Sequence, residues 1–476
     1  MNFPTTLSEC HALLTAQQEQ LAAQSVQIAY LVAKVAELEA RLNKNSGNSD
    51  QPPSSDGLSK KPAIRPAFER KKGRKSGGQP GHKGKTLEIS ATPDHTQSHL
   101  PSHCECGQAL DKSAARVLAI RQVFDLPDPK LEITEHQQLG CACHECGRYH
   151  QGTFPASVVA RTQYGSGVKA MVVLLNTWFK LPLKKIQTLF GDFYGYGINE
   201  STIVKATGLC YDQLEASEEG IKKSLLKSVA AHFDETGMRV VGKLHWLHAC
   251  CTTLFTYLFI HAKRGTEALE DRASILPNFK QWAIHDCWTS YFKFTDCSHG
   301  ICGAHVLREL KALEEQKVEW ASWFRKYLLS LYRMSGQGKG RIPAEKKQKA
   351  LRLFERIWSD ADEMEPQPVK SKSGRGRPKG TKGRNLLIRF KKHQSALLAF
   401  AFEAHVPFTN NQAERDLRPA KTKQKVAGSF RALEGAKRFA RIQGFVSTTR
   451  KHQLNVFQQL KRAFEGQTFL TDQNTG

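Results

Sequence analysis

The chain has 476 residues, with 70 Lys and Arg against 45 Asp and Glu, which gives a formal net charge of +25. This excess of positive charge favours a polyanionic partner, above all nucleic acid, with an acidic membrane surface as the alternative. We expect neither a membrane protein nor a secreted one, because no apolar run approaches the roughly 20 residues of a membrane span and the first residues carry no secretory pattern.

The first 45 residues carry a seven-residue repeat of apolar side chains. The repeat consists of Leu7, Leu14, Leu21, Ile28, Val35 and Leu42. The stretch that it spans contains no Gly or Pro and is rich in helix-forming residues. This pattern predicts a coiled coil over residues 1–45 that associates with further copies of the chain. A single amphipathic helix packed on the body of the protein is the alternative.

Residues 46–99 are predicted to be a basic, disordered linker. The run NSGNSDQPPSSD is rich in turn-forming residues and has no apolar period. It is followed by the basic, Gly-rich GRKSGGQPGHKGK. In a chain of this charge we expect the basic run to contact the phosphates of DNA or RNA, although such runs are also common as solvated tails.

Residues 100–155 contain two cysteine knuckles, HCECG and CACHECG. The 12 cysteines of a chain without an export signal are expected to be metal ligands or core thiols rather than disulfides. Each knuckle ends in Cys-Gly, and glycine lets the backbone turn beneath a metal. The predicted ligands of one structural Zn²⁺ are Cys104, Cys106, Cys143 and Cys146, with His103 as an alternative to Cys104.

Residues 156–225 are predicted to form a helical DNA-binding region. Helical patterns cover residues 168–179 and 183–190, and a further helix opens near Ser201 with Asn199 or Ser201 as its N-cap. Short helices around a Gly-containing turn suit a helix-turn-helix. Ordinary helical packing is the alternative.

Residues 226–450 read as an α/β domain, and residues 451–476 as a C-terminal tail. Strand-like runs lie at residues 229–233, 244–251, 253–261 and 282–285. Helical patterns follow at residues 304–315, 320–331 and 344–358. Strands followed by helices predict an α/β core with a helical insertion at about residues 305–405. The basic stretch between Pro366 and Arg384 resembles a minor-groove arm in composition, with a flexible charged loop as the alternative.

Three carboxylates stand in positions that suit metal chemistry. Asp234 ends the strand-like SVAAHFDET, Asp286 ends WAIHDCW, and Glu414 lies in NNQAERDLRP, which opens a helix. Carboxylates at strand ends project into a cleft at the sheet edge. Mg²⁺ prefers oxygen ligands, and two such ions can promote in-line phosphoryl transfer. Taken singly, each acid is more often a surface or capping residue, and composition alone does not select these three.

Long blocks of the sequence resemble the insertion-sequence-66 family of DDE transposases. The blocks are FDET, HDCWTSYF with HGICGAHVLREL, and the long run from NNQAERDLRPAKTKQKVAGSF to STTRKHQLNVF. The resemblance extends over nearly the whole chain, including NKNSGNSDQPPSSDG, GGQPGHKG and the Cys-Gly knuckles. It implies a ribonuclease-H-like α/β catalytic core with a helical insertion. The core would follow the coiled coil, a small zinc module and a helix-turn-helix-like region.

The resemblance also implies residue roles. Asp234, Asp286 and Glu414 match the DDE triad, which would bind two Mg²⁺ or Mn²⁺ ions. Cys302 and His305 match a Cys-x-x-His motif of such domains, for which a packed helix start is the alternative. The cations expected to hold DNA phosphates near the metals are Arg415, Arg418, Lys421, Lys423 and Lys425. The first knuckle departs from the family, which more often has Cys-x-x-Cys there, so the choice between His103 and Cys104 stays open.

The implied function is DNA transposition. The protein would bind the ends of its mobile element, hydrolyse a phosphodiester and join the freed 3′ hydroxyl to target DNA. The expected partners are double-stranded DNA, further copies of the chain and accessory proteins encoded by the element, in the bacterial cytoplasm at the nucleoid. A DNA-binding regulator without catalysis and a nuclease that cuts without joining are the alternatives.

Overall fold

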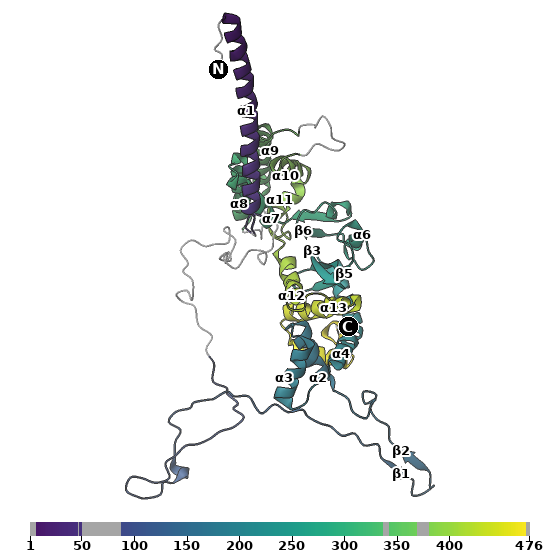
Figure 1. Ribbon diagram of the computed structural model, residues 1–476. Coiled ribbons are helices and arrows are strands. Elements are labelled where there is room, and N and C mark those ends of the chain that lie inside the picture. Colours follow the sequence, from purple (N-terminus) through teal and green to yellow (C-terminus); the bar gives the residue numbers. More distant parts are fainter. Residues whose placement is uncertain (1–5, 46, 50–86, 337–341, 369–379, 473–476) are drawn as a thin grey trace. The chain divides into compact units, whose positions relative to one another are not determined.

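The computed structural model describes residues 6–45, 47–49, 87–336, 342–368 and 380–472 (Figure 1). The chain divides into two compact units. The first holds residues 1–64, 155–188 and 198–476, and the second holds residues 65–154 and 189–197. The basic run predicted in the linker and most of the basic stretch after Pro366 lie outside the described residues.

A five-stranded mixed sheet forms the centre of the first unit, in the order β5-β4-β3-β6-β7. Its strands are β3 (Ala230–Val240), β4 (Lys243–Cys251), β5 (Thr256–His261), β6 (Trp282–His285) and β7 (Ser298–Ile301). Strands β3, β4 and β5 form an antiparallel meander, whereas β6 lies parallel to β3 and β7 parallel to β6. The sheet and its helices confirm the predicted α/β class. Strand β7 was not predicted, because its residues Ser-His-Gly-Ile form neither an apolar run nor an alternating pattern.

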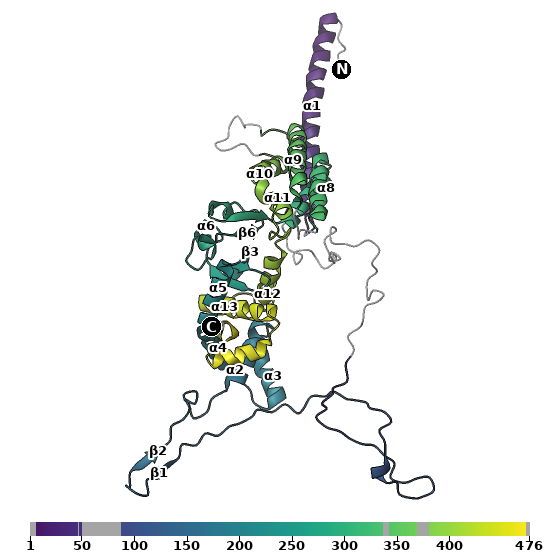
Figure 2. The ribbon, with the colours of Figure 1, turned by 180° about the vertical axis from the view of Figure 1, so that it is seen from behind.

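Two helices of the C-terminal part cover one face of this sheet (Figure 2). Helix α12 (Asn411–Ala427) packs on β3 and β4, and α13 (Leu433–Lys451) packs on β5. The shared core consists of Met238, Leu247, Ala249, Leu258, Leu417, Ala420, Phe439 and Ala440. Alternate residues of β3 face this core, so the even-numbered positions of the strand lie on the side of α12.

The three helices predicted before the sheet are present as α2 (Ser166–Thr177), α3 (Leu183–Tyr194) and α4 (Glu200–Gln213). A fourth, α5 (Glu215–Leu226), was not predicted. As predicted, Asn199 caps α4, since its side chain accepts a hydrogen bond from the Ser201 N–H at 2.9 Å. Helices α2 and α4 pack against α14 (Val456–Phe464), and α5 packs against β5 and α15 (Phe469–Asp472). These contacts join the helices to the unit that contains the sheet.

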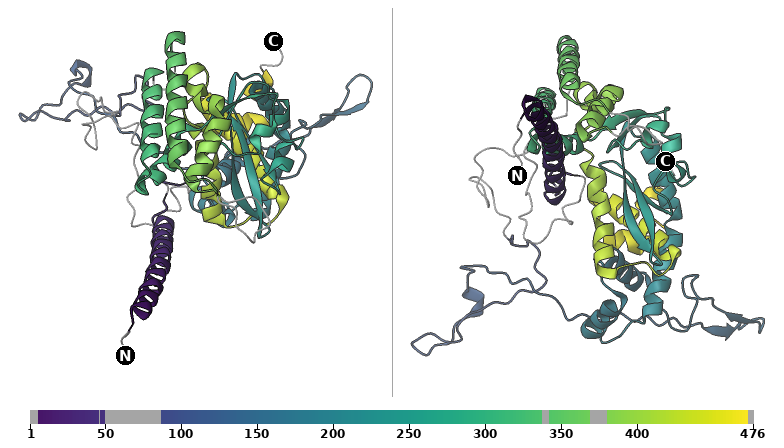
Figure 3. Two further views of the ribbon diagram at one scale, coloured as in Figure 1. Left: turned by 90° about the horizontal axis from the view of Figure 1, so that it is seen from above. Right: turned by 45° about the horizontal axis from the view of Figure 1, so that its top comes forward.

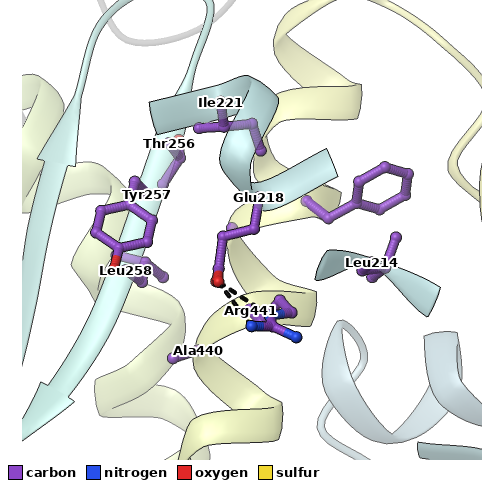
Figure 4. A pocket seen from close by; sticks show the side chains of 10 residues that line it. Leu214, Glu218, Ile221, Thr256, Tyr257, Leu258, Ala440 and Arg441 are labelled. Atoms are coloured by element: carbon purple, nitrogen blue, oxygen red, sulfur yellow. Dashed lines mark hydrogen bonds and ion pairs between the residues drawn. The ribbon is translucent and has the colours of Figure 1, made fainter. Parts of the chain in front are cut away.

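A small cavity lies between α5, β5 and α13 (Figure 4). The guanidinium of Arg441 pairs with Glu218 at 2.9 Å within its lining. A Cβ atom at Gly444 would stand 3.0 Å from the carbonyl oxygen of Thr256, so this glycine allows α13 to approach β5 closely. The cavity is therefore a feature of packing.

A helical insertion separates β7 from α12 (Figure 3). Its helices are α7 (Gly303–Glu315), α8 (Glu319–Met334), α9 (Ala344–Met364), α10 (Lys382–Lys392) and α11 (Gln394–Phe402). The first three match the predicted helical patterns. Phe324 packs edge-on against Phe354 and Phe390, with ring centroids 5.5 and 5.0 Å apart. Helix α11 packs on β7 and so returns the chain to the sheet.

Helix α1 (Leu7–Leu42) covers the predicted coiled-coil segment. All six side chains of the seven-residue repeat are exposed on it. None of the described helices combines the length and the apolar composition that crossing a membrane requires. Shorter turns complete the first unit, at α6 (Thr266–Leu269), η4 (Leu276–Asn278) and η5 (Tyr291–Lys293).

The second unit has little regular structure. Besides the end of α3, it contains η3 (Lys112–Ala114) and the antiparallel pair β1 (Gly140–Ala142) and β2 (Tyr149–Gln151). The apolar side chains of residues 87–154 are largely exposed, and Leu118 is 97% exposed. Residues 87–154 therefore have no hydrophobic core of their own.

Lys180 is a buried cation between α2 and α3. Its ammonium group donates hydrogen bonds to the carbonyl oxygen of Thr177 and, at 2.8 Å, to Oε1 of Gln443. Burial, together with the positive charge of Lys423, lowers the pKa of Lys180 to about 7.

This lysine predicts a pH-dependent stability. The folded chain releases the Lys180 proton near pH 7, whereas the unfolded chain keeps it up to the usual pKa near 10.5. The unfolded state binds more protons in this window, so stability rises with pH there by at most about 1.4 kcal/mol per pH unit. We expect the melting temperature of wild type to increase relative to Lys180→Met between pH 7 and about pH 9. Lys425→Met, at an exposed position, is the control. If the difference in melting temperature between wild type and Lys180→Met is the same at pH 7 and pH 9, Lys180 does not cause the pH dependence.

Candidate active site

Strands β3 and β6 bring Asp234 and Asp286 to the same level of the sheet. Their parallel register pairs His232 with Ile284. Two residues further on, Asp234 comes beside Asp286, which directly follows the end of β6. Asp234 was expected to end its strand, and this was wrong. It lies within β3, where the pairing with β6 has stopped and that with β4 continues.

The two aspartates form a site of concentrated negative charge. Burial raises the pKa of Asp234 well above its usual range, and the charges of Glu235 and Asp286 raise it further, whereas His305 lowers it. Carboxylates that share a site of low dielectric resist being ionised together unless a cation joins them. The electrostatics of this pair therefore suit a bound cation.

Glu414 lies in the first turn of α12, the helix that packs on β3. Its Oε1 atom is buried and has no hydrogen-bond partner. The nearest cationic groups are Nη2 of Arg308 at 3.6 Å and Nε2 of His305 at 3.8 Å. A buried carboxylate oxygen without a donor carries a desolvation cost that a metal ion would offset.

The fully buried Asn410 ties the start of α12 to the strand that carries Asp234. Its side-chain amide donates to the carbonyl oxygen of Phe233 at 2.8 Å, and its Oδ1 lies 2.9 Å from Nδ1 of His232. Its backbone N–H donates to Sγ of Cys302 at 3.1 Å. These bonds hold the first turn of α12, and with it Glu414, next to the middle of β3.

Cys302 and His305 stand at the start of α7. Burial by itself raises the pKa of Cys302, but the adjacent His305 outweighs it and lowers that pKa below its usual value. Burial also lowers the pKa of His305, yet Cys302 and then Glu414 raise it to about 9. A Cβ atom on Gly303 would overlap the ring of Phe408, so this glycine lets α7 lie against the segment that leads to α12.

Glu235 and Arg264 belong to the site but were not predicted. Glu235 faces away from α12 and is buried, with its Oε1 2.7 Å from Nε of Arg264 and its Oε2 accepting from the Tyr291 hydroxyl at 2.6 Å. The guanidinium of Arg264 lies over the rings of Trp246 and Trp288, at 5.1 and 4.4 Å from their centroids. Its Nη2 is 4.0 Å from Oδ2 of Asp286. Adjacency to Asp234 could have indicated Glu235, whereas nothing in the sequence marks Arg264.

The five cations predicted to contact DNA divide into two groups. Arg415, Arg418 and Lys425 are exposed on α12. Lys421 and Lys423 instead donate to the backbone carbonyl oxygens of Gly237 and Asn176, at 3.3 and 3.4 Å. Burial lowers the pKa of both lysines. In this structure these two hold α12 against its neighbours.

The cysteine knuckles are formed locally but are not joined. In the first, the Cys104 N–H bonds to Gln108 and the Gly107 N–H to Cys104, and in the second Cys143 bonds to Arg148 in the same way. Gly107 and Gly147 have the positive φ values of 87° and 70° that such turns require. Hydrogen bonds from the backbone and thiol of Cys106 lower the pKa of Cys104, and those from Cys146 lower the pKa of Cys143.

No group of three or more His, Cys, Asp or Glu residues in the described part of the chain is gathered to hold a metal ion. The predicted zinc set of Cys104, Cys106, Cys143 and Cys146 is accordingly not assembled, and the triad of Asp234, Asp286 and Glu414 is not gathered into one metal-holding group either. In the first knuckle, Nδ1 of His103 bonds to Oγ of Ser102 at 3.0 Å. The knuckles lie in a segment without a core, where a shared metal would draw them together. The lowered thiol pKa values fit zinc, and the carboxylates of the sheet fit Mg²⁺ or Mn²⁺.

Comparison with known proteins identifies the family. A family model described as Transposase IS66 family matches residues 161–438, which contain Asp234, Asp286 and Glu414. A second model, described as a family of unknown function (DUF6444), matches residues 4–88. No curated protein matches the chain. Because the first match covers more than half of the 476 residues, the chain belongs to the Transposase IS66 family.

Proposed function

We propose that this protein is a DDE-type DNA transposase in which Asp234, Asp286 and Glu414 hold two Mg²⁺ or Mn²⁺ ions. Membership of the family supports transposition as the function. The observation that carries the residue assignment is the electrostatic crowding of Asp234 and Asp286, together with the buried Glu414 Oε1, which has no hydrogen-bond partner and lies 3.8 Å from His305, a residue that also acts on Asp234. The mixed order of the sheet, with β6 parallel to β3, supports a ribonuclease-H-like core.

The residues of the chain would orient the reaction. When bound, two divalent ions favour attack on the phosphorus and departure of the leaving oxygen. Strands β3 and β6 hold two of the carboxylates at one level, and Asn410 ties the first turn of α12, which carries Glu414, to β3. Cleavage of an element end and its joining to target DNA are both phosphoryl transfers, so one set of carboxylates serves for both.

The exposed cations of α12 are the proposed contacts to DNA. Arg415, Arg418 and Lys425 stand on the helix that carries Glu414, so phosphates bound there would lie close to the carboxylates. The net charge of +25 supports double-stranded DNA as the substrate. The helices of residues 156–225 are further candidates for binding element ends. We place the reaction at the nucleoid of a bacterial cytoplasm, with accessory proteins of the element as possible partners.

Substitution of Asp286 tests the assignment. Asp286→Asn keeps the side-chain shape but removes the charge, so we expect movement of a marked element with its native ends to fall by more than about a hundredfold, beyond the cost of outer-shell changes. Movement is counted in cells that also receive any neighbouring reading frames of the element.

The exposed Asp296, changed to Asn, is the matched control for this loss of charge and should move the element like wild type. Equal movement with Asp286→Asn and wild type would overturn the triad. Absence of movement with wild type, while DNA binding persists, would favour a regulator without catalysis.

We further propose that one Zn²⁺ joins the two knuckles of the second unit through Cys104, Cys106, Cys143 and Cys146. A segment without a core needs such a cross-link to hold a compact form, since metal binding then supplies the folding free energy. In that form the apolar residues between the knuckles that are now exposed, such as Leu118, would become partly buried.

Zinc content tests this proposal. We expect about one zinc per purified chain, and its loss in Cys143→Ser because three ligands hold the ion much less tightly than four. Cys10→Ser, in α1, is the control for removal of a thiol and should keep the metal. His103→Ala separates the alternatives for the first knuckle, since it keeps zinc only if Cys104 is the ligand. A wild-type chain without zinc would refute the module.

Helix α1 is proposed to associate with the same helix of further copies. Its apolar repeat lies exposed in the single chain, and a coiled coil would bury it. Pairing of chains would bring two element ends together.

Removal of residues 1–45 should therefore lower the oligomeric state measured by light scattering. In the full chain, Leu21→Glu should act in the same direction because it places a charge in the apolar seam. Ala23→Glu, at a position outside the repeat, is the matched control and should leave the mass unchanged. An oligomer that survives the deletion would show that other surfaces hold the copies together.

A further inference from the structure

His285 is a polar side chain without any exposure, on β6 directly before Asp286. Its ring stacks on Tyr291, with centroids 4.5 Å apart. Tyr291 in turn bonds to Glu235. A buried imidazole must have its two nitrogens satisfied, and the partners of both are present here.

The hydrogen bonds around His285 define its protonation. The backbone N–H of Cys287 donates to Nδ1 at 3.1 Å, so this nitrogen carries no proton and the ring is neutral. The ring proton is therefore on Nε2, which lies 3.1 Å from Nδ1 of His299 and donates to it. His299 then carries its own proton on Nε2 and donates to the carbonyl oxygen of Phe294 at 3.0 Å. These three hydrogen bonds thus form one series that runs from the N–H of Cys287 to the carbonyl oxygen of Phe294.

This series of hydrogen bonds holds both ends of the loop that follows Asp286. Cys287 opens the loop and Phe294 closes it, while the two histidines stand on the adjacent parallel strands β6 and β7. The rings thus fasten the loop to the sheet at two points.

The first of these points bears on Asp286 directly. Cys287 has a φ of 76°, a left-handed conformation that a residue with a Cβ atom adopts only at a cost. The bond from its N–H to His285 opposes that cost. The turn then brings the Trp288 N–H to Oδ1 of Asp286 at 2.9 Å. The direction of this carboxylate therefore depends on the turn that His285 holds.

We propose that His299, acting through His285, is a positioning residue that aims the Asp286 carboxylate at a divalent cation. The inference rests on the proposed function, because it assumes that Asp286 is a metal ligand. His299 itself touches neither the cation nor DNA. Its part is to accept the hydrogen bond from Nε2 of His285 and to anchor the far end of the loop through Phe294.

Two substitutions of His299 separate positioning from packing. In His299→Gln, the amide oxygen can accept from His285 and the amide nitrogen can donate to Phe294, so both bonds can form again. In His299→Leu neither can. The measurements are Mn²⁺ binding by titration calorimetry of the full chain, and movement of the marked element. We expect His299→Leu to weaken Mn²⁺ binding by at least about tenfold, the usual cost of losing an outer-shell partner, and His299→Gln to stay within about threefold of wild type.

A folded His299→Leu protein that binds Mn²⁺ and moves the element like wild type would overturn the proposal. Equal loss in the Gln and Leu variants would also do so, since it would reflect the shape of the site and not the hydrogen bonds. If His299→Leu does not fold, His299→Phe, which keeps a ring and restores neither hydrogen bond, is measured in its place. Mn²⁺ affinity of folded His299→Phe equal to that of wild type counts against the proposal, and a loss of about tenfold supports it.

Asp286→Asn keeps this test distinct from that of the proposed function. If Asp286→Asn leaves Mn²⁺ binding unchanged, the metal site itself is wrongly assigned. If Asp286→Asn abolishes binding while folded His299→Leu does not weaken it, the metal site stands and the role of His299 alone is wrong.

Discussion

Repulsion among carboxylates at the junction of β3 and β6 is the constraint around which this site is built. The charges of Glu235 and Asp286 raise the pKa of Asp234, and the charge of Asp286 raises that of Glu235. The protein offsets part of this charge with Arg264, which is paired with Glu235 and stacked on two tryptophans. At Asp234, His305 lowers the pKa of the carboxyl, but burial and the charges of Glu235 and Asp286 keep it well above its usual value. The remaining charge is what a divalent ion would balance.

The scaffold holds this unfavourable arrangement from several directions. Parallel pairing sets Asp234 and Asp286 level, and the buried Asn410 ties the first turn of α12 to β3. The helical insertion ends on β7 through α11, so the long excursion between Asp286 and Glu414 returns to the sheet. The two histidines on β6 and β7 fasten the loop after Asp286. Local strain at Cys287 is thereby held by neighbours on two strands.

Periodicity predicted most of the elements well, because burial of one face imposes it on the sequence. Strand β6 and the helices α7, α8 and α9 lie where their apolar patterns indicate. Strand β7 was missed because its residues form no apolar run, and α10 because its basic residues hid its apolar face, on which Leu386, Leu387 and Phe390 are buried. Lys421 and Lys423 show that a positive charge in the sequence does not by itself identify a contact to DNA. A lysine with a long apolar stem can turn inward and bond to a carbonyl oxygen.

The sequence by itself determined the α/β class, the helical repeat of the N-terminal segment, the knuckle turns at their glycines and the family to which the chain belongs. These properties depend on residues close together in the chain, or on a pattern of residues that the family shares. Only the tertiary structure decided that Glu235 and Arg264 flank the aspartates, that Asn410 links α12 to β3, and that His285 and His299 form one hydrogen-bonded chain. Such contacts join distant segments, and their geometry depends on strand register and helix packing, which no local pattern records.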